Sequence, residues 1–283
     1  SLDGGSPVDL TPTLTWDALT FWLASMGREF DITPDGKWIY FSGKQADDQA
    51  VSYDYQIYRV PVTGGPVEEI TTNPASDMLP RISPDGKTLA WRASRRPGYE
   101  SDRYELMVRP VAGGDARSLT ASLDVSVARI YWDPRGTALY FDGEDKGDIV
   151  LYKVSPKGGK ITPVLDGEKT GRGYHVSSQI SKDGKFFTFM YRTIDRYYEI
   201  FRADGAGRNP VPLTRVNAEV YRTYEFPVAK DVWFEGAKGA KVHGFVVEPR
   251  DYDPGKTYPM MVRIHGGPQQ MFGYAFRNEF AIF

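Results

Sequence analysis

The feature that most constrains this chain is a short motif that occurs four times at nearly equal intervals. One copy, at residues 83–91, reads SPDGKTLAW. The other copies begin at positions 33, 133 and 181, so successive copies start 50, 50 and 48 residues apart. Self-similarity at a fixed period of this size indicates an array of equal structural units.

The residues of the motif predict a hairpin turn followed by a strand. Ser or Asp suits the first position of a type I turn, Pro presets φ at the second, and Gly tolerates the positive φ that lets a hairpin continue. The aromatic and aliphatic residues that follow are typical of a β-strand. One copy alone could be an isolated surface turn, but four copies in register favour a repeated hairpin.

A second repeated element lies between the copies of the motif. In the first unit it consists of residues 54–62 (DYQIYRVPV), a turn with two glycines, and residues 67–71. Similar patterns of strand, glycine turn and strand begin at residues 104, 148 and 197. Each unit therefore has four antiparallel strands, A to D, which is typical of a propeller blade. Helical solenoids are excluded because no window shows sustained 3.6-residue periodicity, and β-helix repeats would be shorter.

The first residues of the chain fit this register only in part. Residues 4–11 match residues 64–71, and this match predicts one orphan D strand without the A, B and C strands of its blade. Four complete blades and one strand could close a very small ring. We favour an arc of a larger ring, whose open edges need pairing. The expected fold class is thus mainly β, with a partial β-propeller.

The connections between strands are unequal in length. The A–B and C–D turns are tight and share one face of the ring, whereas the B–C and D–A connections share the other. The first two B–C loops, residues 42–53 and 93–103, are long and charged. Long loops on a rigid scaffold often carry function. Four charged residues of the second loop are therefore candidate substrate-binding residues, with a merely solvated loop as the alternative: Arg95, Arg96, Glu100 and Asp102.

Beyond about residue 215 the pattern changes. Residues 230–236 and 241–249 predict a hairpin. Residues 258–264 (YPMMVRI) predict an apolar strand of the kind that is covered on both faces of an α/β sheet. We therefore predict a propeller segment at residues 1–222 and the first strands of an α/β domain at residues 223–283. Because the chain leaves the last blade on the D–A side, we expect the B–C loops to face this second domain.

The predicted apolar strand leads directly into His265, Gly266 and Gly267. Backbone N–H groups at such a strand end can point at a ligand oxygen, and α/β-hydrolases use a similar loop as half of an oxyanion hole. Glycine is needed because a side chain would block the approach of the ligand. Pro268 has no N–H, so Gly266 or Gly267 must donate. A plain turn at the end of a strand is the alternative reading.

At this point the chain resembles a known family. The order of propeller, hairpin and the sequence DYDPGKTYPMMVRIHGGPQ at residues 251–269 resembles the prolyl oligopeptidase family of serine peptidases, in particular its acylaminoacyl-peptidase and dipeptidyl-peptidase V branch. The SPDGK blades are similar to TolB-like propellers. The resemblance implies an α/β-hydrolase domain, hydrolysis of short peptides, an oxyanion N–H from Gly267 and a positioning role for His265.

The chain departs from the family in its catalytic residues. It contains no Gly-x-Ser-x-Gly sequence, and none of His175, His243 and His265 follows a nucleophile. We therefore expect a piece of a longer enzyme, truncated at both ends and inactive alone, which contributes substrate gating and half of the oxyanion hole. Its partners would be the remainder of the same enzyme and a short peptide. The alternative is a stand-alone β-propeller interaction module without enzymatic activity.

Composition excludes several classes of function. The net charge of −2 gives no electrostatic footprint for nucleic acid or an anionic membrane. No apolar run reaches transmembrane length. Without cysteine there are no disulfides or thiolate metal sites, and we expect no metal or cofactor. The sequence leaves open whether the soluble protein is periplasmic or cytoplasmic, and whether it forms a homo-oligomer.

Overall fold

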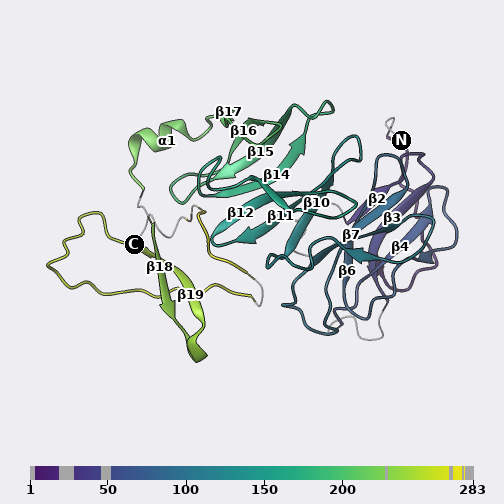
Figure 1. Cartoon of the computed structure of the whole chain (residues 1–283), viewed down its shortest axis with the longest axis horizontal. Helices are drawn as coiled ribbons and strands as arrows, with labels where there is room; N and C mark the ends of the chain where they lie inside the picture. Colours follow the sequence, from purple (N-terminus) through teal and green to yellow (C-terminus); the bar gives the residue numbers. More distant parts are fainter. Residues whose placement is uncertain are drawn as a thin grey trace. The chain divides into compact units, whose positions relative to one another are not determined.

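The computed structural model describes residues 4–18, 29–45, 52–226, 229–267, 270–275 and 277. Strands dominate the described part of the chain, and most of them belong to four-stranded antiparallel blades (Figure 1). In this described part, strand, turn and strand follow one another without long helices, as the turn-rich sequence predicts. The partial propeller is therefore confirmed.

The four blades follow one another along the chain. The first blade consists of β2 (Phe30–Ile32), β3 (Trp38–Lys44), β4 (Gln56–Pro61) and β5 (Glu68–Glu69). The second consists of β6 (Asp77–Ile82), β7 (Thr88–Ala93), β8 (Glu105–Pro110) and β9 (Arg117–Ser118). The third consists of β10 (Val127–Trp132), β11 (Leu139–Asp145), β12 (Asp148–Val154) and β13 (Thr162–Leu165). The fourth consists of β14 (Tyr174–Ile180), β15 (Phe186–Arg192), β16 (Glu199–Asp204) and β17 (Val211–Pro212).

The repeated motif forms the turn between strands A and B of every blade. In the second blade, the N–H of Gly86 donates to the carbonyl oxygen of Ser83 at 2.8 Å, and Gly86 has a φ of +72°. The Ser83 hydroxyl donates to Asp85 at 2.6 Å and accepts from the N–H of Thr88 at 2.9 Å. The side chains of the motif therefore tie the turn to the first residue of the outgoing strand, which explains why this motif recurs with each blade.

Apolar residues from the faces of neighbouring sheets form the core. In one cluster, Tyr40 and Ile57 of the first blade pack with Leu89 and Trp91 of the second, and all four are almost completely buried. Alternating side chains of a strand point to opposite faces, so each central strand contributes to the packing on both sides. This packing accounts for the aromatic and aliphatic residues that follow each hairpin turn.

The beginning of the chain differs from its prediction. The structure assigns no strand to residues 4–10, and Val8 is 77% exposed. The strand next in the chain is the short β1 (Asp17–Ala18), which pairs antiparallel with β3 at Lys44 and Gly43. A strand requires a partner for its backbone groups. The match between residues 4–11 and 64–71 identified a sequence pattern but could not supply that partner.

The segment after the last blade is partly as predicted. It contains α1 (Ala218–Thr223), β18 (Ala229–Glu235), the short helix η2 (Ala237–Gly239) and β19 (Lys241–Val247). Strands β18 and β19 form the predicted hairpin. Residues 258–264 form no strand, and Met260 and Ile264 are more than 80% exposed. That prediction is wrong for this structure, because no described strand pairs with these residues and residues 259–264 are exposed.

The chain divides into two compact units. The first comprises Ser1–Phe141 and Lys153–Thr162, and the second comprises Asp142–Tyr152 and Pro163–Phe283. The division passes through the third blade, whereas the domain boundary after residue 222 stays a prediction. Within the part of the chain that the structure describes, no helix has the length and apolar character needed to cross a membrane.

Candidate functional site

The His-Gly-Gly loop is exposed and its backbone donors are available. Within the described residues, the N–H groups of Gly266 and Gly267 donate no hydrogen bond. A Cβ atom built on Gly266 would find only the Oε1 atom of Gln270, at 3.9 Å. The Nδ1 atom of His265 donates to the Gly266 carbonyl oxygen at 2.7 Å, which turns this carbonyl towards the ring. The loop thus presents two neighbouring N–H groups that have no acceptor among the described residues.

The residues that follow the loop are held more firmly. Phe272 contacts the His265 ring edge to face, with the ring centroids 5.6 Å apart. Tyr274 and Ala275 are buried, with exposed fractions of 7% and 0%. Ala275 belongs to an apolar cluster with Tyr174 and Val176 of the fourth blade. The chain therefore passes from an exposed loop into a well-packed segment within a few residues.

The hairpin beside this segment carries a polar pair that the sequence did not single out. The Nε2 atom of His243 donates to Asp231 Oδ1 at 2.6 Å, and the His243 ring stacks on Trp233 at 4.3 Å. The Tyr274 hydroxyl donates to the other carboxylate oxygen of Asp231. Burial raises the pKa of Asp231, but the hydrogen bonds from Tyr274 and His243 outweigh it, so the pKa lies below its ordinary value. His243 therefore has a structural role in the hairpin, where it contacts Asp231 and Trp233.

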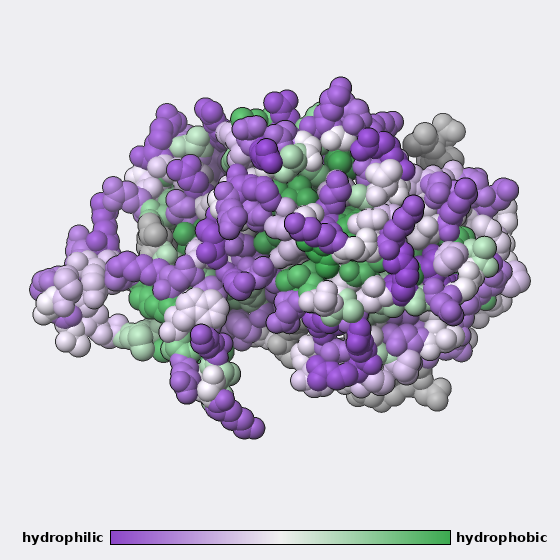
Figure 2. Space-filling view, viewed as in Figure 1, coloured by the Kyte–Doolittle hydropathy of each residue, from purple (hydrophilic) through white to green (hydrophobic). Residues whose placement is uncertain are grey.

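Hydrophobic residues come to the surface over the same hairpin. Figure 2 shows hydrophilic residues over most of the visible face, with hydrophobic residues in the centre of the view and, at lower left, over β18 and β19. Trp233 and Phe234 of β18 are 54% and 56% exposed. Burying such side chains would stabilise a contact. The predicted start of the catalytic domain therefore exposes large apolar side chains on its hairpin.

The second charged loop is organised by one buried carboxylate. Asp102 is 7% exposed and accepts from the backbone N–H groups of Arg95 and Arg96 at 2.7 and 2.8 Å. It also accepts from Arg96 Nε at 2.9 Å. Burial raises the pKa of Asp102. The two backbone hydrogen bonds and the Arg96 contacts lower it by more than burial raises it, so the pKa of Asp102 lies below its usual range. Asp102 closes the loop through these contacts with Arg95 and Arg96.

The other three candidates in this loop are exposed. Arg95 forms an ion pair with the buried Glu105 at 2.8 Å, and the Arg96 guanidinium lies over the Tyr99 ring at 3.9 Å. Glu100 accepts a hydrogen bond from the Tyr53 hydroxyl, which raises the pKa of Tyr53. The structure therefore brings the four predicted residues into one loop but leaves the Glu100 carboxylate as its most accessible anion. Their role in substrate binding stays a prediction.

His175 is a buried structural residue. It has no exposed surface, and its ring stacks on Tyr191 at 4.8 Å. Its Nδ1 atom donates to the Ile149 carbonyl oxygen at 2.9 Å, and its Nε2 atom lies 2.6 Å from the Thr170 hydroxyl. A neutral ring with its proton on Nδ1 satisfies both contacts. Burial lowers the pKa of His175 to about 4, although the Ile149 carbonyl and Asp166 oppose this shift.

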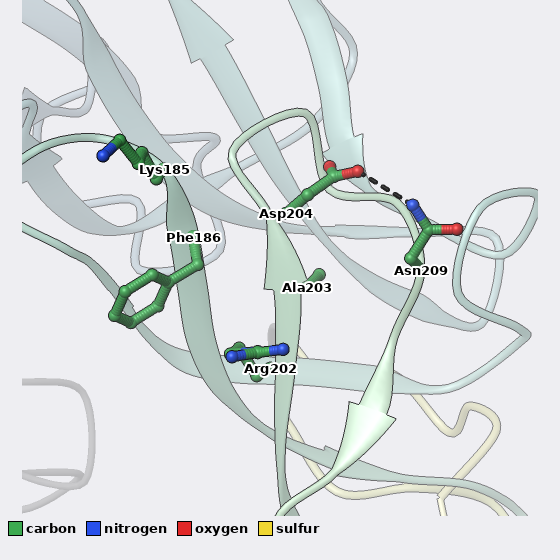
Figure 3. A pocket seen from close by; sticks show the side chains of 6 residues that line it. All are labelled: Lys185, Phe186, Arg202, Ala203, Asp204 and Asn209. Atoms are coloured by element: carbon green, nitrogen blue, oxygen red, sulfur yellow. Dashed lines mark hydrogen bonds between the residues drawn. The ribbon is translucent and has the colours of Figure 1, made fainter.

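A shallow pocket lies at the outer edge of the fourth blade (Figure 3). Asp204 and Asn209 point towards each other across it, with a hydrogen bond of 3.1 Å. Asp204 also accepts from the backbone N–H groups of Ala206 and Arg208, both at 2.9 Å. Its carboxylate thus stabilises the C–D turn. Six residues line the pocket: Lys185, Phe186, Arg202, Ala203, Asp204 and Asn209. Among the described residues, no group of three or more His, Cys, Asp or Glu side chains could hold a metal ion.

Sequence comparisons relate the chain to peptidases. No family model matches it. Over 245 residues it is 27% identical to dipeptidyl-peptidase 5 of Porphyromonas gingivalis, an alignment that covers 86% of this chain and 35% of the relative. Over 256 residues it is 28% identical to a probable dipeptidyl-peptidase 5 of Emericella nidulans, covering 85% of this chain and 35% of the relative. The chain thus spans about a third of the length of these relatives.

Structural comparisons agree on the fold. An acylaminoacyl peptidase from Pyrococcus horikoshii superposes with a TM-score of 0.68 at 20% identity, over 87% of this chain and 36% of that one. A putative TolB from Agrobacterium tumefaciens superposes with a TM-score of 0.53 at 20% identity, over 66% of this chain and 64% of that one. Both likenesses support the propeller. The sequence relatives show that this chain is similar to part of the dipeptidyl-peptidases named above, and the solved structures show that this part has the propeller fold.

Proposed function

We propose that this chain supplies the propeller segment and the first part of the catalytic domain of a serine peptidase that cleaves short peptides. In this proposal the Gly267 N–H donates to the oxygen that becomes negatively charged when the scissile carbonyl is attacked. The serine, aspartate and histidine of the catalytic triad would come from other parts of the complete protein. The chain alone would then bind and position a peptide without hydrolysing it.

One observation carries the proposal. Gly266 and Gly267 present adjacent N–H groups that have no acceptor within the described residues, on a loop that no side chain covers at Gly266. Preorganised donors of this kind stabilise the transition state, because the charge on the oxygen develops only there. The relatives named dipeptidyl-peptidase 5 support peptide hydrolysis as the reaction.

The exposed loop of the second blade would bind one end of the peptide. A free amino terminus carries a positive charge, which the Glu100 carboxylate would attract, while Arg96 would bind a carbonyl or carboxylate oxygen. Dipeptidyl and acylaminoacyl specificity differ at this end, because an acylated amino terminus is neutral. The charge of the Glu100 side chain therefore favours a substrate with a free amino terminus.

The test is Gly267→Val in the complete protein. The added side chain would displace the oxyanion, so we expect kcat on a chromogenic dipeptide to fall by about 10²–10³ while KM changes little. Gly244→Ala in β19 is the matched control, because a Cβ there would meet its neighbours at 3.4 Å or more, an ordinary contact.

Three results would contradict the proposal in different ways. Full turnover by Gly267→Val would remove the assigned role of that glycine. Absence of peptide hydrolysis by the unmodified complete protein, together with no labelling by a serine-reactive fluorophosphonate, would favour the propeller interaction module instead. Equal losses in Gly267→Val and Gly244→Ala would indicate a folding defect of the segment.

A further inference from the structure

The segment that follows the His-Gly-Gly loop is held by a turn of the third blade. Lys146 and Gly147 connect β11 to β12 and have φ values of +48° and +91°, as in a tight hairpin turn. The Gly147 carbonyl oxygen accepts from the N–H of Tyr274 at 2.7 Å. The turn is the B–C connection of its blade. The sequence predicts that B–C connections lie on the face of the propeller towards the catalytic segment.

Two glycines make this approach possible. A Cβ atom on Gly273 would lie 2.2 Å from the Gly147 carbonyl oxygen. A Cβ atom on Gly147 would lie 3.0 Å from both the Phe245 and the Tyr274 rings. A side chain at Gly273 would therefore separate the segment from the turn, and one at Gly147 would crowd both rings. The contact depends on backbone packed directly against backbone.

Contacts from Asp231, Phe245 and Arg172 fix the Tyr274 side chain. Its hydroxyl donates to Asp231, and the Phe245 ring meets it edge to face at 5.0 Å. The Arg172 guanidinium lies over the ring at 3.9 Å. Arg172 is itself held by an ion pair of 2.7 Å with Asp148. Burial and the hydrogen bond to Asp231 raise the pKa of Tyr274, so the hydroxyl stays protonated and donates at physiological pH.

The anchored segment reaches the loop through Phe272. The Phe272 ring contacts the His265 ring at 5.6 Å, and the Arg263 guanidinium lies 5.6 Å from the centre of the same ring. In contrast, Met261 and Val262 on the other side of the loop are 70% and 68% exposed. Among the described residues around the loop, the firm support therefore comes from the side of Tyr274.

We propose that Tyr274, bracketed by Gly147, Asp231 and Arg172, is a positioning residue that holds the oxyanion loop in place through Phe272. This inference rests on the proposed function of Gly267. Tyr274 lies seven positions after Gly267 and does not touch the substrate in this scheme. Because Tyr274 is bound to a propeller turn, the position of that turn would determine the position of the Gly267 N–H, which stabilises the transition state.

The experiment measures kcat and KM of Tyr274→Ala in the complete protein. An error of about 1 Å in the position of a catalytic group can cost about 10²-fold in rate, so we expect kcat to fall tenfold to a hundredfold. KM should stay within about twofold, since an oxyanion donor acts mainly in the transition state. Tyr274→Phe, which keeps the ring but loses the hydrogen bond to Asp231, should recover much of the loss. Tyr224→Phe is the control, because Tyr224 is 63% exposed.

Each outcome decides between the two proposals. If Gly267→Val loses turnover and Tyr274→Ala keeps kcat within twofold, the positioning role is wrong and the oxyanion role stands. If Tyr274→Ala does not fold, Phe272→Leu decides, because it removes the ring between the anchor and His265. Unchanged kcat in Phe272→Leu would then overturn the inference. If the unmodified protein hydrolyses no peptide, the inference falls with the proposed function.

Discussion

Acidification should weaken the fourth blade through His175. The ordinary pKa of histidine is 6.5, and burial lowers the pKa of His175 to about 4. Between these two pH values the unfolded chain binds a proton that the folded chain does not, so the free energy of unfolding falls as the pH falls. At 1.36 kcal/mol per pK unit, a difference of about 2.5 units corresponds to about 3 kcal/mol. The loss should begin near pH 6.5 and level off below pH 4.

Native-state hydrogen exchange can measure this locally in the complete protein. Peptides from β14 and β15 report the opening free energy of the region that buries His175. After correction for intrinsic exchange rates, we expect their protection to fall on the order of a hundredfold between pH 6.5 and pH 4, as about 3 kcal/mol requires. In His175→Gln the protection should be lower at neutral pH, because stacking on Tyr191 is lost, but its dependence on pH should nearly vanish.

A buried carboxylate in the second blade provides a control of opposite sign. Burial raises the pKa of Asp77 to about 6, although the hydrogen bond from the Asn73 side chain opposes this shift. Here the folded chain binds the extra proton, so protection of β6 and β7 should rise as the pH falls from 6 towards 3.8. Asp77→Asn should remove that rise and leave β14 unchanged. The reasoning on His175 is refuted if the original protein and His175→Gln lose protection in β14 and β15 equally.

Two further predictions concern the exposed parts of the chain. Residues 260–264 expose four apolar side chains, so this chain expressed alone should self-associate. The double change Met261→Lys and Val262→Lys should reduce the mass measured by light scattering. A monodisperse, cooperatively unfolding original chain would contradict this prediction. In the complete protein, Glu100→Lys should raise KM for dipeptide substrates with a free amino terminus by several-fold without lowering Tm, whereas Asp115→Lys in the tight C–D turn of the same blade should not. Equal KM values in the two variants would remove Glu100 from the substrate site.

The sequence by itself determined the blades, because the residues that specify each turn and strand lie close together in the chain. Pro, Asp and Gly set the backbone of each A–B turn, and the Ser83 hydroxyl and its counterparts complete the turn within six residues. Alternating apolar residues then define which face of each strand is buried. The hairpin of β18 and β19 followed from the same kind of evidence. The His-Gly-Gly loop could also be found in the sequence, because three adjacent residues define it.

The tertiary structure decided whatever depends on a partner from elsewhere in the chain. Residues 258–264 have a strand-like sequence but form no strand, because hydrogen bonds to a neighbouring strand are what make a strand stable. The sequence predicts a substrate-binding role for Asp102, which stays a prediction, but only the tertiary structure shows that its carboxylate accepts hydrogen bonds within its own loop. Tyr274 lies in no recognisable motif, and its role became apparent only when Gly147, more than a hundred residues earlier, was found against it. Such long-range contacts leave little trace in one sequence, since each residue is ordinary until its neighbours are known.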